Sequence, residues 1–184
     1  MTSEGNNLPV TISQSVYCEM LHGSRGMPLF ILDNFRSAFN VGSVFRSAEA
    51  VSPAGIMLTG ICCRPGNRKL GRTARGTHAL VPWMYFPRVS DAIGWAKSSG
   101  RMIVAVENAP SAVPIWDIDF DSPPAFILGS EADGLDEEVV SSADECVFFP
   151  QSGIRTSINV ASAASLAAFE IQRRRINGTY TPQK

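Results

Sequence analysis

The chain alternates between short, almost wholly apolar runs and longer segments in which apolar residues recur every three or four positions. Runs this short and this uniformly apolar are typical of strands that are buried on both faces. The alternation of strand-like and helix-like segments predicts an α/β fold with a mostly parallel sheet flanked by helices. The apolar runs lie at residues 28–32, 55–60, 81–86, 102–106, 126–128 and 146–149, and helical spacing is clearest at 41–51 and 89–100.

Polar loops follow both of the last two apolar runs. GSEADG (residues 129–134) follows the first, and PQSG (residues 150–153) follows the second. A long helix rich in small residues comes next, and either Thr156 or Ser157 is suited to cap it. Loops that leave the carboxyl ends of parallel strands are where open α/β sheets bind ligands. We therefore expect these two loops to wrap one small molecule. The apolar face of the helix comprises Val160, Ala161, Ala164, Ala168 and Ile171.

A third polar loop, residues 33–40, follows the first apolar run. Asn40 is a good cap for a helix that starts at Val41, and Arg46 falls outside the apolar stripe of that helix, near its first turns. Arg46 is thus expected to lie close to the loop that holds Asn40. Elsewhere, Pro82 predicts an edge or irregular strand. The proline-rich segment 107–124 is expected to be a loop, in which the apolar pair at 115–116 must still be buried.

The length of 184 residues suits one domain with a substantial core. We assign residues 26–176 to this domain, 1–25 to an N-terminal extension with one short helix at 13–22, and 177–184 to a short C-terminal tail. A hydrophobic content of 45% and a charged content of 18% exclude disordered and fibrous classes. Neither a signal peptide nor a membrane-spanning run is visible, so the expected location is the cytoplasm, without membrane contact.

One segment departs from the near-neutral average of the chain. The formal net charge is −1, yet residues 64–75 contain five basic residues and no acid, so this segment carries +5 and the remainder −6. Such a cluster is typical of a surface that binds phosphates. A solvated loop that happens to be rich in arginine is the alternative. The basic residues are Arg64, Arg68, Lys69, Arg72 and Arg75.

Other common sites find little support in the sequence. The four cysteines show no CxxC spacing and there are only two histidines, so we predict free thiols and no metal site. Residues 129–134 have the glycine spacing of a phosphate loop but lack the Lys and Ser/Thr that must follow. Residues 66–73 place Arg72 where a lysine is needed, and these two cations are not interchangeable there. The pattern GxGxxG is absent after every predicted strand.

Five polar residues mark the strand-end loops and helix starts, namely Asn40, Arg46, Glu131, Ser157 and Asn159. Taken one at a time, each has a structural explanation as a cap, a surface side chain, a loop acid or an ordinary helix residue. Their combination is more informative. The segments NVGSVFRSA (40–48), LGSEADGL (128–135) and FPQSGIRTSINVASA (149–163) are similar to the three signature motifs of the SpoU (TrmH-like) family of RNA ribose 2′-O-methyltransferases, in the same order and spacing.

The resemblance implies a SPOUT fold, in which the C-terminal strands and helix form a deep trefoil knot that holds S-adenosylmethionine. It also implies a homodimer with the active site at the subunit boundary. Members of this family grip the cofactor mainly with main-chain groups, and glycines allow that close approach. The residues expected to contact the cofactor are Gly129, Phe149 and Ile158, together with Gly134 and Glu107 from the same strand-end loops.

The reaction implied by the resemblance is attack of an RNA ribose 2′-oxygen on the sulfonium methyl group. A hydroxyl is a poor nucleophile, so a base or a polarising group must lie beside it. The family assigns this role to the arginine that matches Arg46. Asn40, Glu131, Ser157 and Asn159 would orient Arg46 and the substrate. The basic cluster would bind the RNA, with Arg36 and Arg155 nearer the site. We expect tRNA rather than rRNA as substrate; a non-catalytic RNA- or cofactor-binding protein of the same fold is the alternative.

Overall fold

A computed structural model describes residues 26–155 and 157–181 of the chain. Within these residues seven strands form one sheet in the order β3-β2-β1-β6-β4-β7-β5, and every neighbouring pair is parallel. The predicted α/β class with a mostly parallel sheet is confirmed. The strands are β1 (Leu29–Asp33), β2 (Gly55–Thr59), β3 (Trp83–Phe86), β4 (Met102–Val106), β5 (Val113–Pro114), β6 (Pro124–Leu128) and β7 (Glu145–Phe148).

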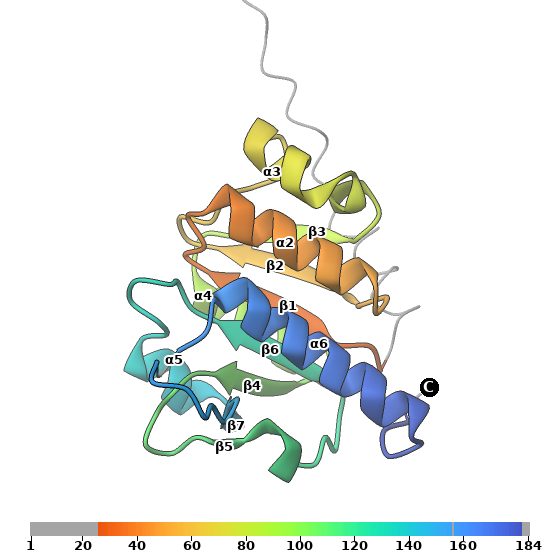
Figure 1. Ribbon diagram of the computed structural model, residues 1–184, viewed down its shortest axis with the longest axis vertical. Helices are drawn as coiled ribbons and strands as arrows, with labels where there is room; N and C mark the ends of the chain where they lie inside the picture. Colours follow the sequence, from red (N-terminus) through yellow and green to blue (C-terminus); the bar gives the residue numbers. More distant parts are fainter. Residues whose placement is uncertain (1–25, 156, 182–184) are drawn as a thin grey trace, which may run out of the picture.

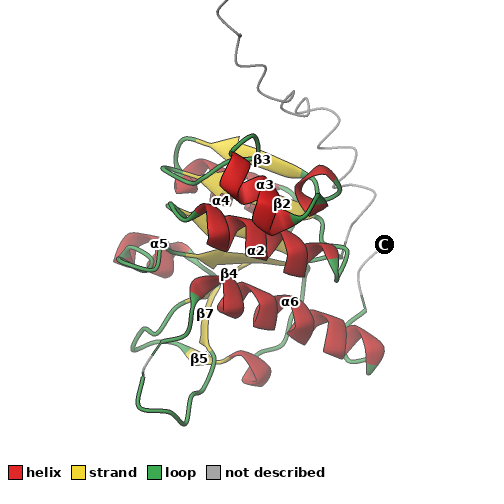
Figure 2. Ribbon diagram, turned by 45° about the horizontal axis from the view of Figure 1, so that its top comes forward, coloured by secondary structure: helices red, strands yellow, loops and turns green. Residues whose placement is uncertain are grey.

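Helices cover both faces of the sheet. On one face α2 and α6 lie side by side, and α3 packs beyond α2 (Figure 1). The hydroxyls of Ser47 on α2 and Ser165 on α6 are 2.6 Å apart and join these two helices directly. Figure 2 shows the same layers from another side. The helices are α2 (Ala38–Glu49), α3 (Arg68–Ala74), α4 (Val89–Ser98), α5 (Glu137–Ser142) and α6 (Val160–Ile176), with 3₁₀ turns η1 (Thr77–Ala79) and η2 (Ile115–Asp117).

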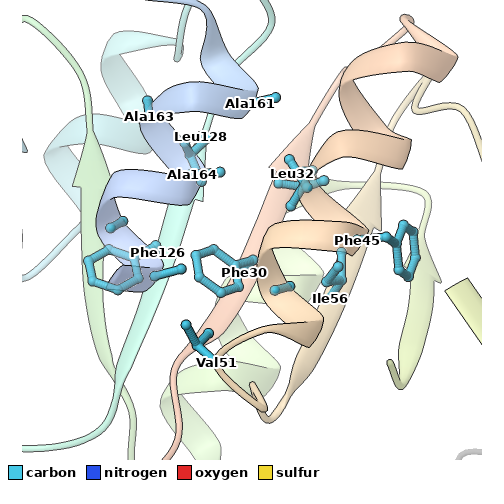
Figure 3. Close-up of a cluster of buried hydrophobic side chains, with 14 of the residues drawn as sticks. Phe30, Leu32, Phe45, Val51, Ile56, Phe126, Leu128, Ala161, Ala163 and Ala164 are labelled. Atoms are coloured by element: carbon cyan, nitrogen blue, oxygen red, sulfur yellow. The ribbon is translucent and has the colours of Figure 1, made fainter. Parts of the chain in front are cut away.

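The central strands are apolar throughout because each side of the sheet has its own core. In β1, Phe30 and Leu32 pack under α2 and α6, whereas Leu29 and Ile31 face α4. All four side chains are at most 1% exposed. Figure 3 shows the first of these cores, with the Phe30 and Phe126 rings stacked at a centroid distance of 5.8 Å. At about 25 cal/mol per Å² of apolar surface removed from water, these two cores are the main source of stability.

The predicted apolar face of α6 is confirmed. Ala161, Ala164, Ala168 and Ile171 are at most 4% exposed, and Val160 packs against the same core. The helix is also anchored near its end by Arg174, which is 6% exposed. Its guanidinium donates to the carbonyls of Ile115 and Ile118 at 3.0 and 2.7 Å and to Glu170 Oε1 at 2.7 Å. Arg174 thereby ties α6 to the segment between β5 and β6.

Both helix caps predicted from the sequence were wrong. Ser37 caps α2, since its Oγ accepts from the Asn40 amide, so Asn40 lies inside the first turn and is buried. Asn159, not Thr156 or Ser157, caps α6, which therefore starts at Val160. Each loop contains several residues suited to cap a helix, and only the position at which the chain turns decides between them. Thr156 and the helix predicted at 13–22 lie outside the described residues.

The sequence also concealed several short elements. The segment 107–124 contains β5 and η2 in addition to loop, and of its apolar pair Ile115 is fully buried while Trp116 is 52% exposed. The basic cluster is partly helical, because α3 runs through it with Asn67 as its cap. The placement of β3 at an edge of the sheet, as Pro82 indicated, is confirmed.

Candidate active site

A cleft of about 520 Å³ lies at the carboxyl ends of β4, β6 and β7, where these neighbouring strands give way to loops and to the start of α6. This is the edge of the sheet at which the sequence placed a small-molecule site. The lining comprises Val106, Glu107 and Asn108 after β4; residues 128–134 after β6; Phe148, Phe149 and Gln151 after β7; and residues 157–160 with Ala163 at the start of α6.

The loop after β6 folds back on itself so tightly that it needs glycine at both ends. A Cβ atom at Gly129 would lie 2.1 Å from the main-chain carbon and oxygen of Gly134. Gly134 has a φ of +69°, and its amide donates to the Ser130 carbonyl at 3.0 Å. No other residue would allow this contact at Gly129 without moving the chain. The loop can therefore present its main-chain groups, rather than bulky side chains, to the cleft.

Glu107 holds this loop in place from the end of β4. Its Oε2 accepts from the amide of Leu135 and its Oε1 from that of Asn108, both at 2.9 Å. The same carboxylate sits against Gly134, where an added Cβ would lie 2.6 Å from Oε2. Glu107 thus joins the ends of two adjacent strands while it also lines the cleft.

Three of the predicted catalytic residues meet at the rim of the cleft. Asn159 Oδ1 accepts from the amides of Ala161 and Ser162 at 2.9 and 3.2 Å, which caps α6. Its Nδ2 therefore points away from the helix and donates to Glu131 Oε1 at 2.5 Å and to Asn40 Oδ1 at 3.3 Å. Residues from the start of α2, the loop after β6 and the start of α6 form one hydrogen-bonded cluster.

The residues predicted to contact the cofactor also line this cleft. Its lining includes Gly129, Gly134, Glu107, Phe149 and Ile158, together with the catalytic candidate Ser157. The structure thus brings all five predicted cofactor residues to one cavity.

Arg46 does not join the cluster within this chain. It is exposed, belongs to the last turn of α2, and lines none of the cavities described here. The expectation that it lies near the first turns was wrong, because α2 begins at Ala38 rather than Val41. Six helical positions separate Asn40 from Arg46, which corresponds to roughly 9 Å along the axis and to a different face.

A second cavity of about 150 Å³ adjoins the first on the side of β1. It is lined by residues 34–37, Asn40, residues 130–132 and Val160. Four of these residues also line the first cavity, namely Ser130, Glu131, Ala132 and Val160. Arg36 lies at this cavity, is exposed, and its Nη2 is 4.0 Å from Asp133 Oδ2.

Sequence reasoning missed the polar support of this second cavity. Asn34 adopts a φ of 56°, and it accepts from the Ile61 amide at 3.1 Å and donates to Asp33 at 3.0 Å. Asp33 is 5% exposed and also accepts from the Thr59 hydroxyl at 2.5 Å. Asp33 and Thr59 are polar residues that end neighbouring apolar runs, and this was the signal that could have revealed them.

The basic cluster lies beside α2, opposite α6. All five of its cations are exposed, and Arg64 stacks on the Tyr85 ring at 4.3 Å from its centroid. Gly42 lets α3 approach α2 closely, because a Cβ there would lie 2.8 Å from Thr73 Cβ. Arg155, the remaining predicted RNA contact, is exposed in the loop before α6.

The residues that the structure describes offer little basis for thiol or metal chemistry. Burial raises the pKa of Cys62 to about 12 and also raises the pKa of Cys146, so these thiols stay protonated at neutral pH. Among the described residues, no three His, Cys, Asp or Glu side chains gather in a way that could hold a metal ion. Nor is any helix there both long and apolar enough to cross a lipid bilayer.

Known proteins are similar to this chain in sequence and in fold. The model of the SpoU rRNA Methylase family matches residues 27–169. The tRNA (guanosine(18)-2′-O)-methyltransferase of Escherichia coli (strain K12) is 28% identical over 162 residues, which cover 87% of this chain and 69% of that enzyme. The 23S rRNA (uridine(2479)-2′-O)-methyltransferase of Streptomyces viridochromogenes is 28% identical over 152 residues, covering 80% of this chain and 53% of that protein.

A solved structure gives the same picture. The SpoU methyltransferase AviRb from Streptomyces viridochromogenes, crystallised in complex with the cofactor AdoMet, superposes with a TM-score of 0.76 at 25% identity. The alignment covers 83% of this chain and 59% of that one. The fold, the cleft and these matches define the class, a methyltransferase that uses S-adenosylmethionine. More narrowly, the chain belongs to the SpoU rRNA Methylase family.

Proposed function

We propose that this protein transfers a methyl group from S-adenosylmethionine to a ribose 2′-hydroxyl of tRNA, and that it does so as a homodimer. The observation that carries the proposal is the cluster of Asn40, Glu131 and Asn159 at the rim of a cleft shaped by main-chain groups. Of the three residues, Asn40 and Asn159 are 119 positions apart in the sequence. The smaller second cavity, which shares a wall with the cleft, is where the ribose would enter.

The chain would hold the cofactor in the larger cleft, with Gly129, Gly134, Phe149 and Ile158 around it. The cofactor supplies an electrophilic methyl group on a sulfonium. The 2′-oxygen forms the new O–C bond, the S–C bond breaks, and the hydroxyl proton must leave to an acceptor beside the ribose. The asparagine–glutamate cluster would fix the attacking oxygen in line with the methyl group, which supplies a large part of such a rate enhancement.

Arg46 has the proposed role of positioning the ribose and its phosphate. A guanidinium offers five hydrogen-bond donors in a planar fork and no acceptor, so it suits phosphate oxygens. Within one chain Arg46 lies away from the cluster, on the exposed side of α2. A second subunit packed against this side of the molecule would complete the site, either by bringing its own Arg46 to the cluster or by carrying the substrate across to it.

The surface of α6 supports this association. Ile158, Leu166 and Phe169 are 38%, 47% and 51% exposed, and they line a groove of about 630 Å³ that also includes Asn159. Exposed apolar side chains grouped in this way are typical of protein interfaces. The groove and the catalytic cluster thus share a residue, and we propose that the partner subunit covers both.

The test is transfer of radiolabelled methyl groups from S-adenosylmethionine to bulk tRNA and, in parallel, to bulk rRNA. We expect label in the tRNA, and nuclease digestion should release it as a 2′-O-methylated nucleotide. The preference for tRNA is supported by the similarity to the Escherichia coli enzyme, which spans most of this chain. Label in rRNA alone would reverse the preference, and cofactor binding without transfer to either RNA would favour a non-catalytic protein.

The role of Arg46 is tested in the same assay. Arg46→Ala should reduce transfer by roughly 100-fold or more, the scale expected when a positioning group is lost. Cofactor affinity measured by calorimetry should change little, because Arg46 does not line the cleft. Arg88→Ala, which also removes an exposed arginine, is the control. Unimpaired transfer by Arg46→Ala would refute the role.

A further inference from the structure

The orientation of the Asn40 amide follows from the cap of α6. Because Asn159 Oδ1 accepts from two helix amides, Asn159 must present Nδ2 to its neighbours. Asn40 therefore turns its Oδ1 toward Asn159. Its own Nδ2 makes no hydrogen bond to a described residue, and Asn40 lines the second cavity. Asn40 is only 3% exposed, yet its Nδ2 is not among the buried atoms that lack a partner, so this atom is reached by solvent and can donate to a ligand in the cavity.

Arg36 supplies further donors to the same cavity. Its guanidinium faces Asp133 at 4.0 Å, and both side chains are about two-thirds exposed, at 66% and 67%. Asp133 is oriented by Ser130, whose hydroxyl donates to Asp133 Oδ2 at 3.2 Å and accepts from the Asp133 amide at 3.1 Å. An exposed ion pair of this kind changes an equilibrium by no more than about five-fold, so a better anion can displace Asp133.

The remaining charged group of the cavity is Glu131, and it offers an acceptor. One of its oxygens already accepts from Asn159. The cavity thus combines donors, Arg36 and Asn40, with one carboxylate. A ribose-phosphate unit is complementary to this arrangement, because its anionic oxygens need donors while its hydroxyl groups can donate to a carboxylate.

We propose that Arg36 and the Nδ2 of Asn40 bind a phosphodiester of the RNA in the second cavity, and that Asp133 competes with this phosphodiester for Arg36. This inference rests on the proposed function and adds to it a phosphate subsite and a weak inhibitory contact. In this proposal the Arg36 guanidinium turns from Asp133 to the phosphodiester, so the ion pair breaks when RNA binds. Without RNA, Asp133 occupies Arg36, and the phosphodiester must displace it in order to bind.

A double-mutant cycle on Arg36 and Asp133 tests the competition. The affinity of the full chain for bulk tRNA is measured without cofactor, at fixed salt because phosphate contacts are salt-dependent. Asp133→Asn should tighten binding by about two- to five-fold, since it releases Arg36. Arg36→Ala should weaken binding, and in that background Asp133→Asn should have little further effect.

Asp136→Asn is the matched control. It removes the same charge from an exposed aspartate three residues further on, and thus reports the general effect of lowering the negative charge near RNA. The gain in tRNA affinity from Asp133→Asn must exceed the gain from Asp136→Asn when Arg36 is present. In the Arg36→Ala background the two gains must be equal. Asn40→Asp adds a second arm, because a carboxylate in place of the amide donor should weaken tRNA binding by ten-fold or more.

The outcomes separate this inference from the proposed function. Equal effects of Asp133→Asn and Asp136→Asn in both backgrounds would overturn the competition, even if the protein methylates tRNA normally. Unchanged affinity in Asn40→Asp would overturn the phosphate subsite. Failure of the wild-type protein to transfer methyl groups to any RNA would overturn the proposed function, whatever the cycle gives.

Discussion

Asn159 has two roles that depend on each other. Its carbonyl oxygen caps α6, and its amide nitrogen holds Glu131 and Asn40. The cap fixes which end of the side chain faces the cluster, so an ordinary helix start determines the polarity of the site. Serine caps a helix about as well as asparagine does, but it is too short to take over the second role.

The two roles can be separated by substitution. Asn159→Ser should leave the free energy of unfolding within about 0.5 kcal/mol of wild type, whereas Asn159→Ala should lower it by about 1 kcal/mol. Both should reduce methyl transfer by roughly 10- to 100-fold, since the cluster loses its central donor. Urea unfolding and the transfer assay provide the two measurements. If Asn159→Ser retained full transfer, the cluster would be irrelevant to the reaction.

At the scale of elements, α2 carries contacts on both of its sides. Gly42 admits α3 on one side, and Ser47 meets Ser165 of α6 on the other. A single helix, α2, therefore lies between the basic cluster and the hydrogen-bonded cluster, and it also carries Arg46. We propose that the basic cluster on α3 binds RNA beside the side of α2 on which the second subunit packs.

The contribution of α3 should appear in the salt dependence of RNA binding. Replacing Arg68, Lys69 and Arg72 by Ala should weaken binding to tRNA and flatten the plot of log K against log salt concentration. The expected change is about 0.7–0.9 for each lost phosphate contact, or roughly 2–3 in total. Arg88→Ala should alter the slope by less than one contact. An unchanged slope in the triple variant would move the RNA surface elsewhere.

The end of α6 should respond to acid. Hydrogen bonding from Arg173, and then from Arg174, lowers the pKa of Glu170 below the ordinary value of a glutamate. The stabilisation by this carboxylate is therefore present above about pH 4.5 and is lost as the pH falls through the lowered pKa. At pH 7, Glu170→Gln should reduce Tm by about 2–4 °C.

Thermal melting between neutral and strongly acidic pH tests this linkage. The difference in Tm between wild type and Glu170→Gln should shrink as the pH falls below 4.5. Glu138→Gln, which removes an exposed glutamate from α5, should leave the pH profile unchanged. A difference in Tm that stayed constant across the whole range would show that the Glu170 charge does not stabilise the fold.

At the scale of the whole molecule, the short apolar runs could be recognised in the sequence because most strands face a core on each side of the sheet. Six of the seven described strands were predicted on this basis. The exception, β5, has only two residues and leaves no periodic signal. The caps of α2 and α6 were misassigned because several residues suited to a cap stand close together in each loop. The cluster itself became visible only through the motif resemblance, since no local pattern links Asn40 to Asn159. The trefoil knot stays a prediction.

Association of two chains is the prediction that belongs to the whole molecule. Phe169→Asp should convert a dimer to a monomer, because it places a charge in the apolar groove of α6. Sedimentation velocity measures the change, and methyl transfer should fall with it. Trp116→Asp alters a side chain of nearly equal exposure, 52% against 51%, on another surface and should leave the dimer intact. A monomeric wild-type protein with full activity would contradict the proposal.

The separation of 119 positions between Asn40 and Asn159 has a consequence for synthesis. As the polypeptide leaves the ribosome, β1 and α2 emerge well before the residue that caps α6 and meets Asn40. A nascent chain can thus build most of its sheet before any competent centre exists. In refolding experiments, activity should accordingly recover no earlier than α6 forms.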